Sequence, residues 1–107
     1  MNSMQQDNEL KVVFHAPTSE ALQRARSNAM NLRREDPGAD VCIVINAEAV
    51  AEALDEAHPD ADEFTWVCPN TLARINRENR QPLRLLDRAA VLELVRLQQS
   101  GWAYIRS

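Results

Sequence analysis

Glycine is scarce in this chain, with two residues among 107. The sequence therefore offers no glycine-rich loop of the kind that holds phosphates, which argues against a nucleotide site of the P-loop or dinucleotide type. No apolar run approaches the ~20 residues that a membrane-spanning helix needs. The first eight residues are polar and lack the apolar core of a signal peptide. We therefore expect no membrane partner.

Cysteine is equally scarce, and its two residues lie in unlike settings. Cys42 lies inside the apolar run 41–45 and is expected to be a core residue. Cys68 ends the run that begins at Phe64 and is followed at once by a proline. This arrangement argues against a disulfide framework and favours a reducing, cytoplasmic location.

The net charge of −4 conceals an uneven distribution. Residues 1–66 carry thirteen acidic and five basic side chains, whereas residues 67–107 carry three acidic and seven basic ones. The arginines downstream of Cys68 either form an anion-attracting rim around it or are simply solvated. Overall acidity and the lack of interleaved aromatic residues argue against a nucleic-acid partner. The arginines of this group are Arg74, Arg77, Arg80, Arg84 and Arg88.

Apolar runs and helix signals alternate along the rest of the chain. Thr18 or Ser19, Asn46 and Asp87 are expected to cap three of the helices. Five strands alternating with four helices predict a three-layer α/β/α domain with a mostly parallel sheet, flavodoxin-like in general architecture. This single domain is expected over residues 10–107, after a polar tail at residues 1–9. The strands are expected at residues 10–15, 41–45, 64–67, 83–86 and 102–105, and their order cannot be read from this pattern.

The transition at Cys68 is the most informative part of the sequence. A strand is expected to stop at Val67, and Pro69 suits the first position of a helix, where its missing N–H costs nothing. Cys68 then stands at the N-cap, where unpaired backbone N–H groups and the helix dipole favour a thiolate. The alternative is a packed cysteine, because free cysteines are among the most buried residues.

Four short motifs carry a resemblance to a known family. They are Lys11-Val-Val-Phe-His15, Val44-Ile-Asn46, Val67-Cys68-x-Asn70-Thr71-Leu72 and Leu97-Gln98-x-x-Gly101-Trp-Ala-Tyr104-Ile105. Together they resemble the DsrE/DsrF-like family over nearly the whole chain. The resemblance implies a small α/β protein that forms trimers or hexamers and belongs with intracellular sulfur-trafficking proteins. Alanines at positions 47 and 90 depart from the glycines expected there.

The resemblance gives Cys68 a specific role, because the matching cysteine of better understood relatives carries sulfur as a persulfide. The chain is then a sulfur carrier or sulfurtransferase with donor and acceptor proteins as partners and no cofactor. The rival hypothesis is a non-catalytic oligomeric module that binds a small anion or a protein, with Cys68 structural. No metal site is expected, since the histidines and Cys68 lack a recognised ligand spacing. The candidate binding residues are His15, Asn46, Asn70, Thr71 and Arg74.

Overall fold

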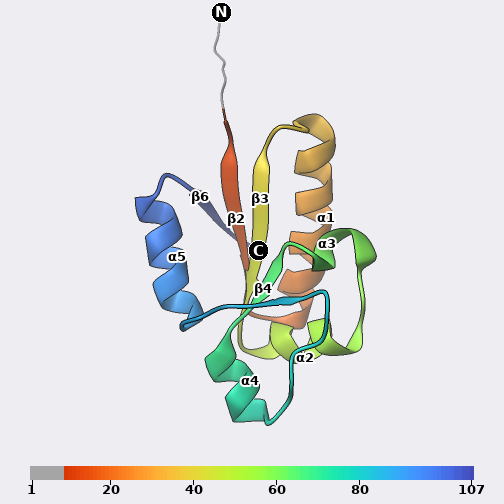
Figure 1. The fold of residues 1–107 in the computed structure, drawn as a ribbon. Coiled ribbons are helices and arrows are strands. Elements are labelled where there is room, and N and C mark those ends of the chain that lie inside the picture. The colour runs from red at the N-terminus through yellow and green to blue at the C-terminus, as the bar shows by residue number, and fades with distance from the viewer. Residues whose placement is uncertain (1–8) are drawn as a thin grey trace, which may run out of the picture.

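The structure is a computed structural model that describes residues 9–107, so the expected polar tail lies outside the described residues apart from residue 9. The described elements follow one another as strands separated by helices (Figure 1). In chain order they are β2 (Lys11–Ala16), α1 (Ser19–Glu35), β3 (Asp40–Ile45), α2 (Glu48–Asp55), α3 (Pro59–Asp62), β4 (Thr65–Val67), α4 (Pro69–Ile75), β5 (Arg84–Leu85), α5 (Ala90–Gln99) and β6 (Ala103–Arg106).

The strands form one five-stranded sheet in which every pair is parallel, in the order β5-β4-β3-β2-β6. This confirms the predicted α/β class. Strands β2 to β5 are added one after another in one direction, and β6 then returns to the far side of β2. The chain therefore reverses its direction of winding between β2 and β6, which is where open α/β sheets bind ligands beyond the carboxyl ends of their strands.

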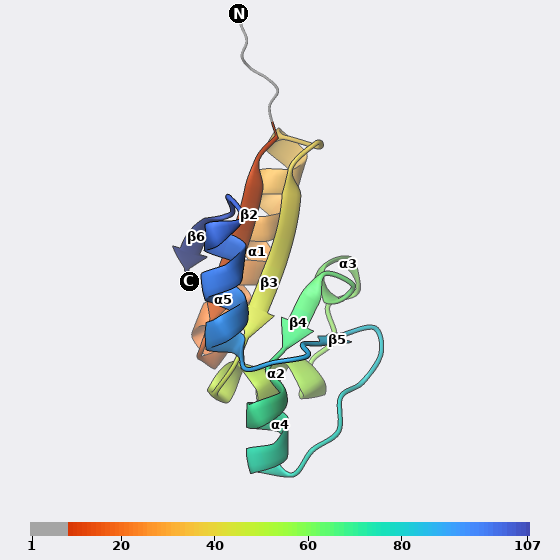
Figure 2. The ribbon, with the colours of Figure 1, turned by 60° about the vertical axis from the view of Figure 1, so that its left-hand side comes forward.

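The two faces of the sheet are covered unequally. Helices α1, α2 and α3 lie on one face, over the larger cluster of buried side chains, which includes Phe14, Leu22, Ile43 and Ile45. The opposite face carries α5, and it buries a smaller cluster around Val13, Cys42, Val44 and Cys68 (Figure 2). Alternate residues of β3 contribute to the two clusters, as expected of a strand buried on both sides. Cys68 thus lies on the less covered face.

Two expected helix caps are wrong, and each has a local cause. Thr18 does cap α1, accepting a hydrogen bond from the N–H of Ala21 at 3.0 Å. Asn46, however, does not cap α2, because its side-chain oxygen accepts a hydrogen bond from His15 and the N-cap is Ala47. Asp87 is exposed and lies two residues before Ala89, the N-cap of α5.

The helical content also differs from the expectation by one short element. The segment at His58 was expected to end the second helix, but it leads into α3, a single turn with Pro59 at its start. Asp62 closes that turn by accepting a hydrogen bond from the N–H of His58 at 3.0 Å. A four-residue helix has no apolar periodicity of its own, so its sequence looks like the end of a helix.

Ala47 has a backbone conformation that alanine rarely adopts, with φ 52° and ψ −136°. Glycine reaches this region without a steric penalty. We expect Ala47→Gly to raise the free energy of unfolding by about 1 kcal/mol, measured by urea denaturation. Ala51→Gly, in the interior of α2, is the matched control and should lower it by about 1 kcal/mol. If Ala47→Gly were less stable than the wild type, the inference that the backbone of Ala47 is strained would be wrong.

Candidate functional site

Cys68 lies at the carboxyl end of β4, where the sequence predicted it. Its backbone N–H donates to the carbonyl of Ile45 at 3.1 Å, which continues the pairing with β3 by one residue. Pro69 opens α4, and Cys68 is the N-cap residue. The predicted change from strand to helix at this position is therefore confirmed. The side chain is nearly enclosed, since Cys68 is 5% exposed.

A second helix also begins at the Cys68 sulfur. The N–H of Ala90, the first residue of α5, donates to Sγ at 3.4 Å. This N–H has no acceptor inside its own helix, as is true of every first-turn N–H group. The starts of α4 and α5 thus converge on one sulfur atom, and the positive ends of both helix dipoles favour negative charge there.

These hydrogen bonds decide the protonation of the thiol. Burial raises the pKa of Cys68, but hydrogen bonds from the backbone of Ala90, Thr71 and Asn70 and from the Thr71 hydroxyl outweigh it. The pKa of Cys68 is therefore lowered below the ordinary value of 9.0. Asn70 and Thr71, both candidate residues, contribute through their positions in the first turn of α4. The arrangement can hold a thiolate, which is the nucleophilic form of cysteine.

Cys42 has the opposite environment although it is on the same face of the sheet. It is 8% exposed and lies in β3 among apolar side chains, as predicted. Burial, together with the charge of Glu93, raises the pKa of Cys42 to about 12. No hydrogen bond to its sulfur is present within residues 9–107. The two thiols are similarly enclosed and differ in the groups that face the sulfur.

His15 and Asn46 come together at the ends of two neighbouring strands. His15 Nε2 lies 3.0 Å from the Asn46 side-chain oxygen, and His15 Nδ1 lies 2.6 Å from the hydroxyl of Tyr104. With the proton on Nε2, the imidazole donates to Asn46 and accepts from Tyr104. This trio borders the switch point between β2 and β6, on the same face of the sheet as Cys68.

Tyr104 was missed as a site residue. The sequence placed it on the last expected strand, at residues 102–105, without indicating its contact with His15. The sequence does not predict that β6 pairs with β2. His15 and Tyr104 are 89 residues apart in the chain, and only the strand order of the sheet brings them together.

Most of the arginines downstream of Cys68 contact other parts of the fold and do not surround the sulfur. Arg74 lies in the last turn of α4, at the other end of that helix from Cys68. Arg77 pairs with Asp55 at 2.8 Å, and Arg80 pairs with the buried Asp62 at 2.8 Å. Arg84 lies over the Trp66 ring at 5.4 Å. Three of the five arginines therefore serve as structural partners of other elements.

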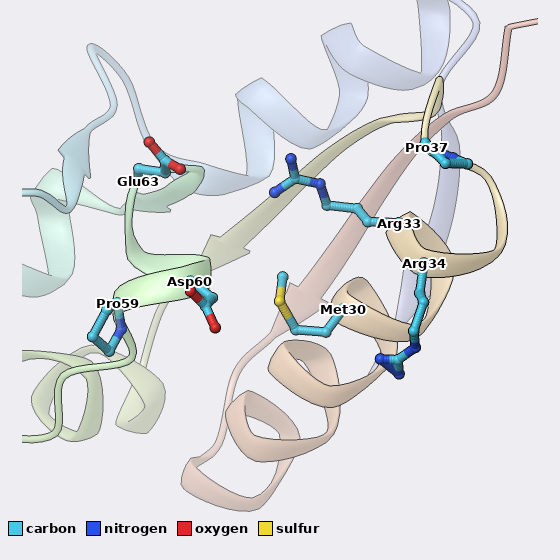
Figure 3. Close-up of a pocket in the computed structure, with 7 residues that line it drawn as sticks. All are labelled: Met30, Arg33, Arg34, Pro37, Pro59, Asp60 and Glu63. Atoms are coloured by element: carbon cyan, nitrogen blue, oxygen red, sulfur yellow. The ribbon is translucent and has the colours of Figure 1, made fainter.

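The structure also has a hollow that lies away from Cys68. Its volume is about 460 Å³, and it is open to solvent between the end of α1 and the turn of α3 (Figure 3). It lies near the amino ends of β3 and β4, whereas Cys68 follows the carboxyl end of β4. Charges of both signs surround it, so it favours no one class of ligand. Its lining residues are Met30, Arg33, Arg34, Pro37, Pro59, Asp60 and Glu63.

Comparison with family models and with curated proteins finds no match to this chain. Within the described residues, no helix has the length and apolar character needed to cross a membrane. Over the same part of the chain, no three His, Cys, Asp or Glu side chains gather closely enough to hold a metal ion. Support for the candidate site therefore comes from the contacts and burial of its own residues.

Proposed function

We propose that this chain is a cytoplasmic sulfur carrier of the DsrE/DsrF-like type, which holds sulfur as a persulfide on Cys68. The observation that supports it most is the hydrogen bond from the Ala90 N–H to Sγ of Cys68, the N-cap residue of α4. A carrier thiol must be ionised near neutral pH and must lie where a partner protein can reach it. Cys68 follows the carboxyl end of β4, and ligands of open α/β sheets bind at the carboxyl ends of the strands, which supports the proposal.

The transfer needs no oxidant or reductant. The Cys68 thiolate attacks the outer sulfur of a donor persulfide, the donor S–S bond breaks, and the donor leaves as its thiolate. An acceptor thiolate then attacks the outer sulfur of the Cys68 persulfide and releases the Cys68 thiolate. Each step exchanges one S–S bond for another, as in thiol–disulfide exchange. The N–H groups at Cys68 stabilise the thiolate both before loading and after release.

Mass spectrometry of the native protein tests the carrier directly. Incubation with glutathione persulfide should add about one sulfur, ~32 Da, that dithiothreitol removes. Cys68→Ser should abolish the adduct and keep the fold, since serine is itself a good N-cap. Cys42→Ser should keep the adduct, although a hydroxyl in the apolar strand costs about 1–3 kcal/mol. An unmodified wild type, or equal uptake by Cys68→Ser, would refute the carrier.

One observation favours the rival function, a non-catalytic module with a structural Cys68. The side chain is 5% exposed, so a donor must approach through a small opening or the surrounding loops must move. In that case the hydrogen bond from Ala90 only holds α5 against the sheet. Absence of any removable sulfur, with Cys68→Ser less stable than the wild type, would select this function.

We also infer that the chain self-associates, with a trimer or hexamer favoured by the family resemblance. Large apolar side chains remain exposed on the outer side of α5, where Val91 is 67% and Val95 is 46% exposed. Tyr104 and Ile105 are exposed on β6, an edge strand of the sheet. Such neighbouring apolar side chains on a small domain are typical of protein interfaces.

Sedimentation equilibrium measures this association. The wild type should sediment as a homo-oligomer, and Val91→Glu combined with Val95→Glu should shift it to the monomer by placing charges in the interface. Asn28→Glu, an exposed change on α1 at the other face of the sheet, is the control and should leave the mass unchanged. A wild type that stays monomeric at all concentrations would refute the inference.

A further inference from the structure

A second cavity lies between α5 and the sheet, on the less covered face. Its volume is about 160 Å³, which is of the order that holds a benzene-sized molecule. Cys42 and Val44 of β3 line it from the sheet, and Leu86 lines it from the segment before α5. The remaining lining residues are Trp66, Glu93, Leu97 and Trp102. This cavity is not used by the chemistry proposed for Cys68.

The shape of the lining favours a flat apolar body. Trp66 and Trp102 each present an indole ring, and Leu86, Leu97 and Val44 supply aliphatic side chains. Aromatic rings bind flat groups by offset stacking and edge-to-face contact. The cavity is only partly enclosed, because both tryptophans and Leu97 are half-buried. A small molecule can therefore enter it from solvent.

The charge of the lining residues indicates which charge the ligand should carry. Glu93 is the one charged residue that lines this cavity, and its carboxylate makes no hydrogen bond or ion pair within residues 9–107. Its charge acts inside the cavity, since it helps to raise the pKa of Cys42 to about 12. Cys42 therefore remains a neutral thiol and adds no second negative charge. A cation is the complementary ligand, and an anion would be repelled.

The tryptophans reinforce this choice, because an indole face is the best aromatic partner of a cation. The guanidinium of Arg84 lies over one face of the Trp66 ring, 5.4 Å from its centroid, so a ligand can meet Trp66 only by its other face or its edge. We propose that the cavity binds a small organic cation, an ammonium group joined to one aromatic ring, with Glu93 pairing the ammonium and the two tryptophans packing against the ring. This inference does not rest on the sulfur-carrier function.

Titration with benzylammonium, followed by tryptophan fluorescence, tests the proposal. Benzyl alcohol is the neutral ligand of nearly the same shape. We expect saturable binding of benzylammonium at least about tenfold tighter than binding of benzyl alcohol, since a charge-assisted contact contributes about 1.5–3 kcal/mol. Equal affinities for the two probes, or no saturable change with benzylammonium, would overturn the proposal.

Three variants assign the binding to this cavity. Glu93→Gln should remove the preference for the cation, and Leu97→Trp should fill the cavity and abolish binding of both probes. Glu78→Gln, an exposed change between α4 and β5, is the matched control and should bind as the wild type does. Glu93→Lys should instead prefer benzoate, which keeps the test decisive if Leu97→Trp fails to fold. Unchanged selectivity in Glu93→Gln, or a second copy of the chain filling the cavity, would refute the assignment.

Discussion

Replacing Asp62 with alanine is expected to lower the free energy of unfolding by about 3–5 kcal/mol, a large part of the stability of a small domain. The Asp62 carboxylate is 1% exposed and faces two guanidinium groups, Arg80 at 2.8 Å and Arg26 at 3.4 Å. Arg26 is itself 2% exposed, and its burial lowers its pKa against the opposing effect of Asp62. Without the carboxylate, Arg26 would be a buried charge without its main partner. Urea denaturation measures the loss.

Asp60→Ala is the matched control, because Asp60 belongs to the same short helix but is exposed. Its effect should stay within about 0.5 kcal/mol. Asp62→Asn should fall between the two, since the amide keeps one acceptor for the N–H of His58 and for one arginine. If Asp62→Ala lowers the free energy of unfolding no more than Asp60→Ala does, the buried carboxylate is not what holds α1, α3 and the segment after α4 together.

The same cluster illustrates what the sequence could not predict. The excess of arginine downstream of Cys68 was plain from composition, but composition does not tell which way a side chain points. Arg80 turns back to Asp62 and to the carbonyls of Ala53 and Leu54 at the end of α2. That contact depends on where the long connection before β5 lies. Composition therefore left two alternatives open, an anion-attracting rim or solvated arginines, and three of the five arginines instead have partners elsewhere in the fold.

Local patterns predicted the fold well because they act over a few residues. The continuous apolar run at residues 41–45 predicted a strand buried on both faces, and β3 is the central strand of the sheet. The short α3 was missed, since one turn leaves no periodicity. The strand order was out of reach, because it depends on which face each helix packs against rather than on any single segment.

Some features of the candidate site could likewise be predicted from neighbouring residues, and others depend on the folded chain. The N-cap position of Cys68 was predicted from its immediate neighbours, Val67 and Pro69, and the structure confirms it. The donor at Ala90 lies 22 residues further along the chain, and only the packing of α5 brings it to the sulfur. Ala47 is intermediate, because the resemblance led us to expect glycine there, whereas the positive φ and the hydrogen bond from its N–H to Thr71 are seen only in the structure.

Cys68 should react with iodoacetamide at pH 7 at least ~30-fold faster than Cys42 in the folded protein. The two side chains are 5% and 8% exposed, so access favours neither and the pKa decides. The pKa of Cys42 is about 12, whereas that of Cys68 lies below 9.0. More than three pKa units give over ~1,000-fold more thiolate at Cys68, and its lower intrinsic nucleophilicity offsets about half of this on a logarithmic scale.

The pH dependence separates the two thiols further. Alkylation of Cys68 should rise with pH through a midpoint below 9.0, the ordinary pKa of the thiol, and then level off. Alkylation of Cys42 should keep rising beyond pH 10, because its thiol is still protonated there. Peptide mapping by mass spectrometry gives both rates in one sample. In denaturant the rates should become equal, and an equal or faster Cys42 in the native protein would refute the placement.

Ala90→Pro tests the hydrogen bond that joins the two helices. Proline is tolerated at the first position of a helix, and Ala89 already has the extended backbone, φ −54° and ψ 144°, that a residue before proline prefers. The change removes the N–H donor to Sγ and puts a ring carbon in place of its hydrogen, so the sulfur must also move away from α5. The pKa of Cys68 should rise by about 0.7 unit for a bond of about 1 kcal/mol, and alkylation at a pH below that pKa should slow. Thr71→Val, which removes the hydroxyl that also lowers this pKa, should act in the same direction, and an unchanged pH profile in both variants would mean that these donors do not stabilise the thiolate.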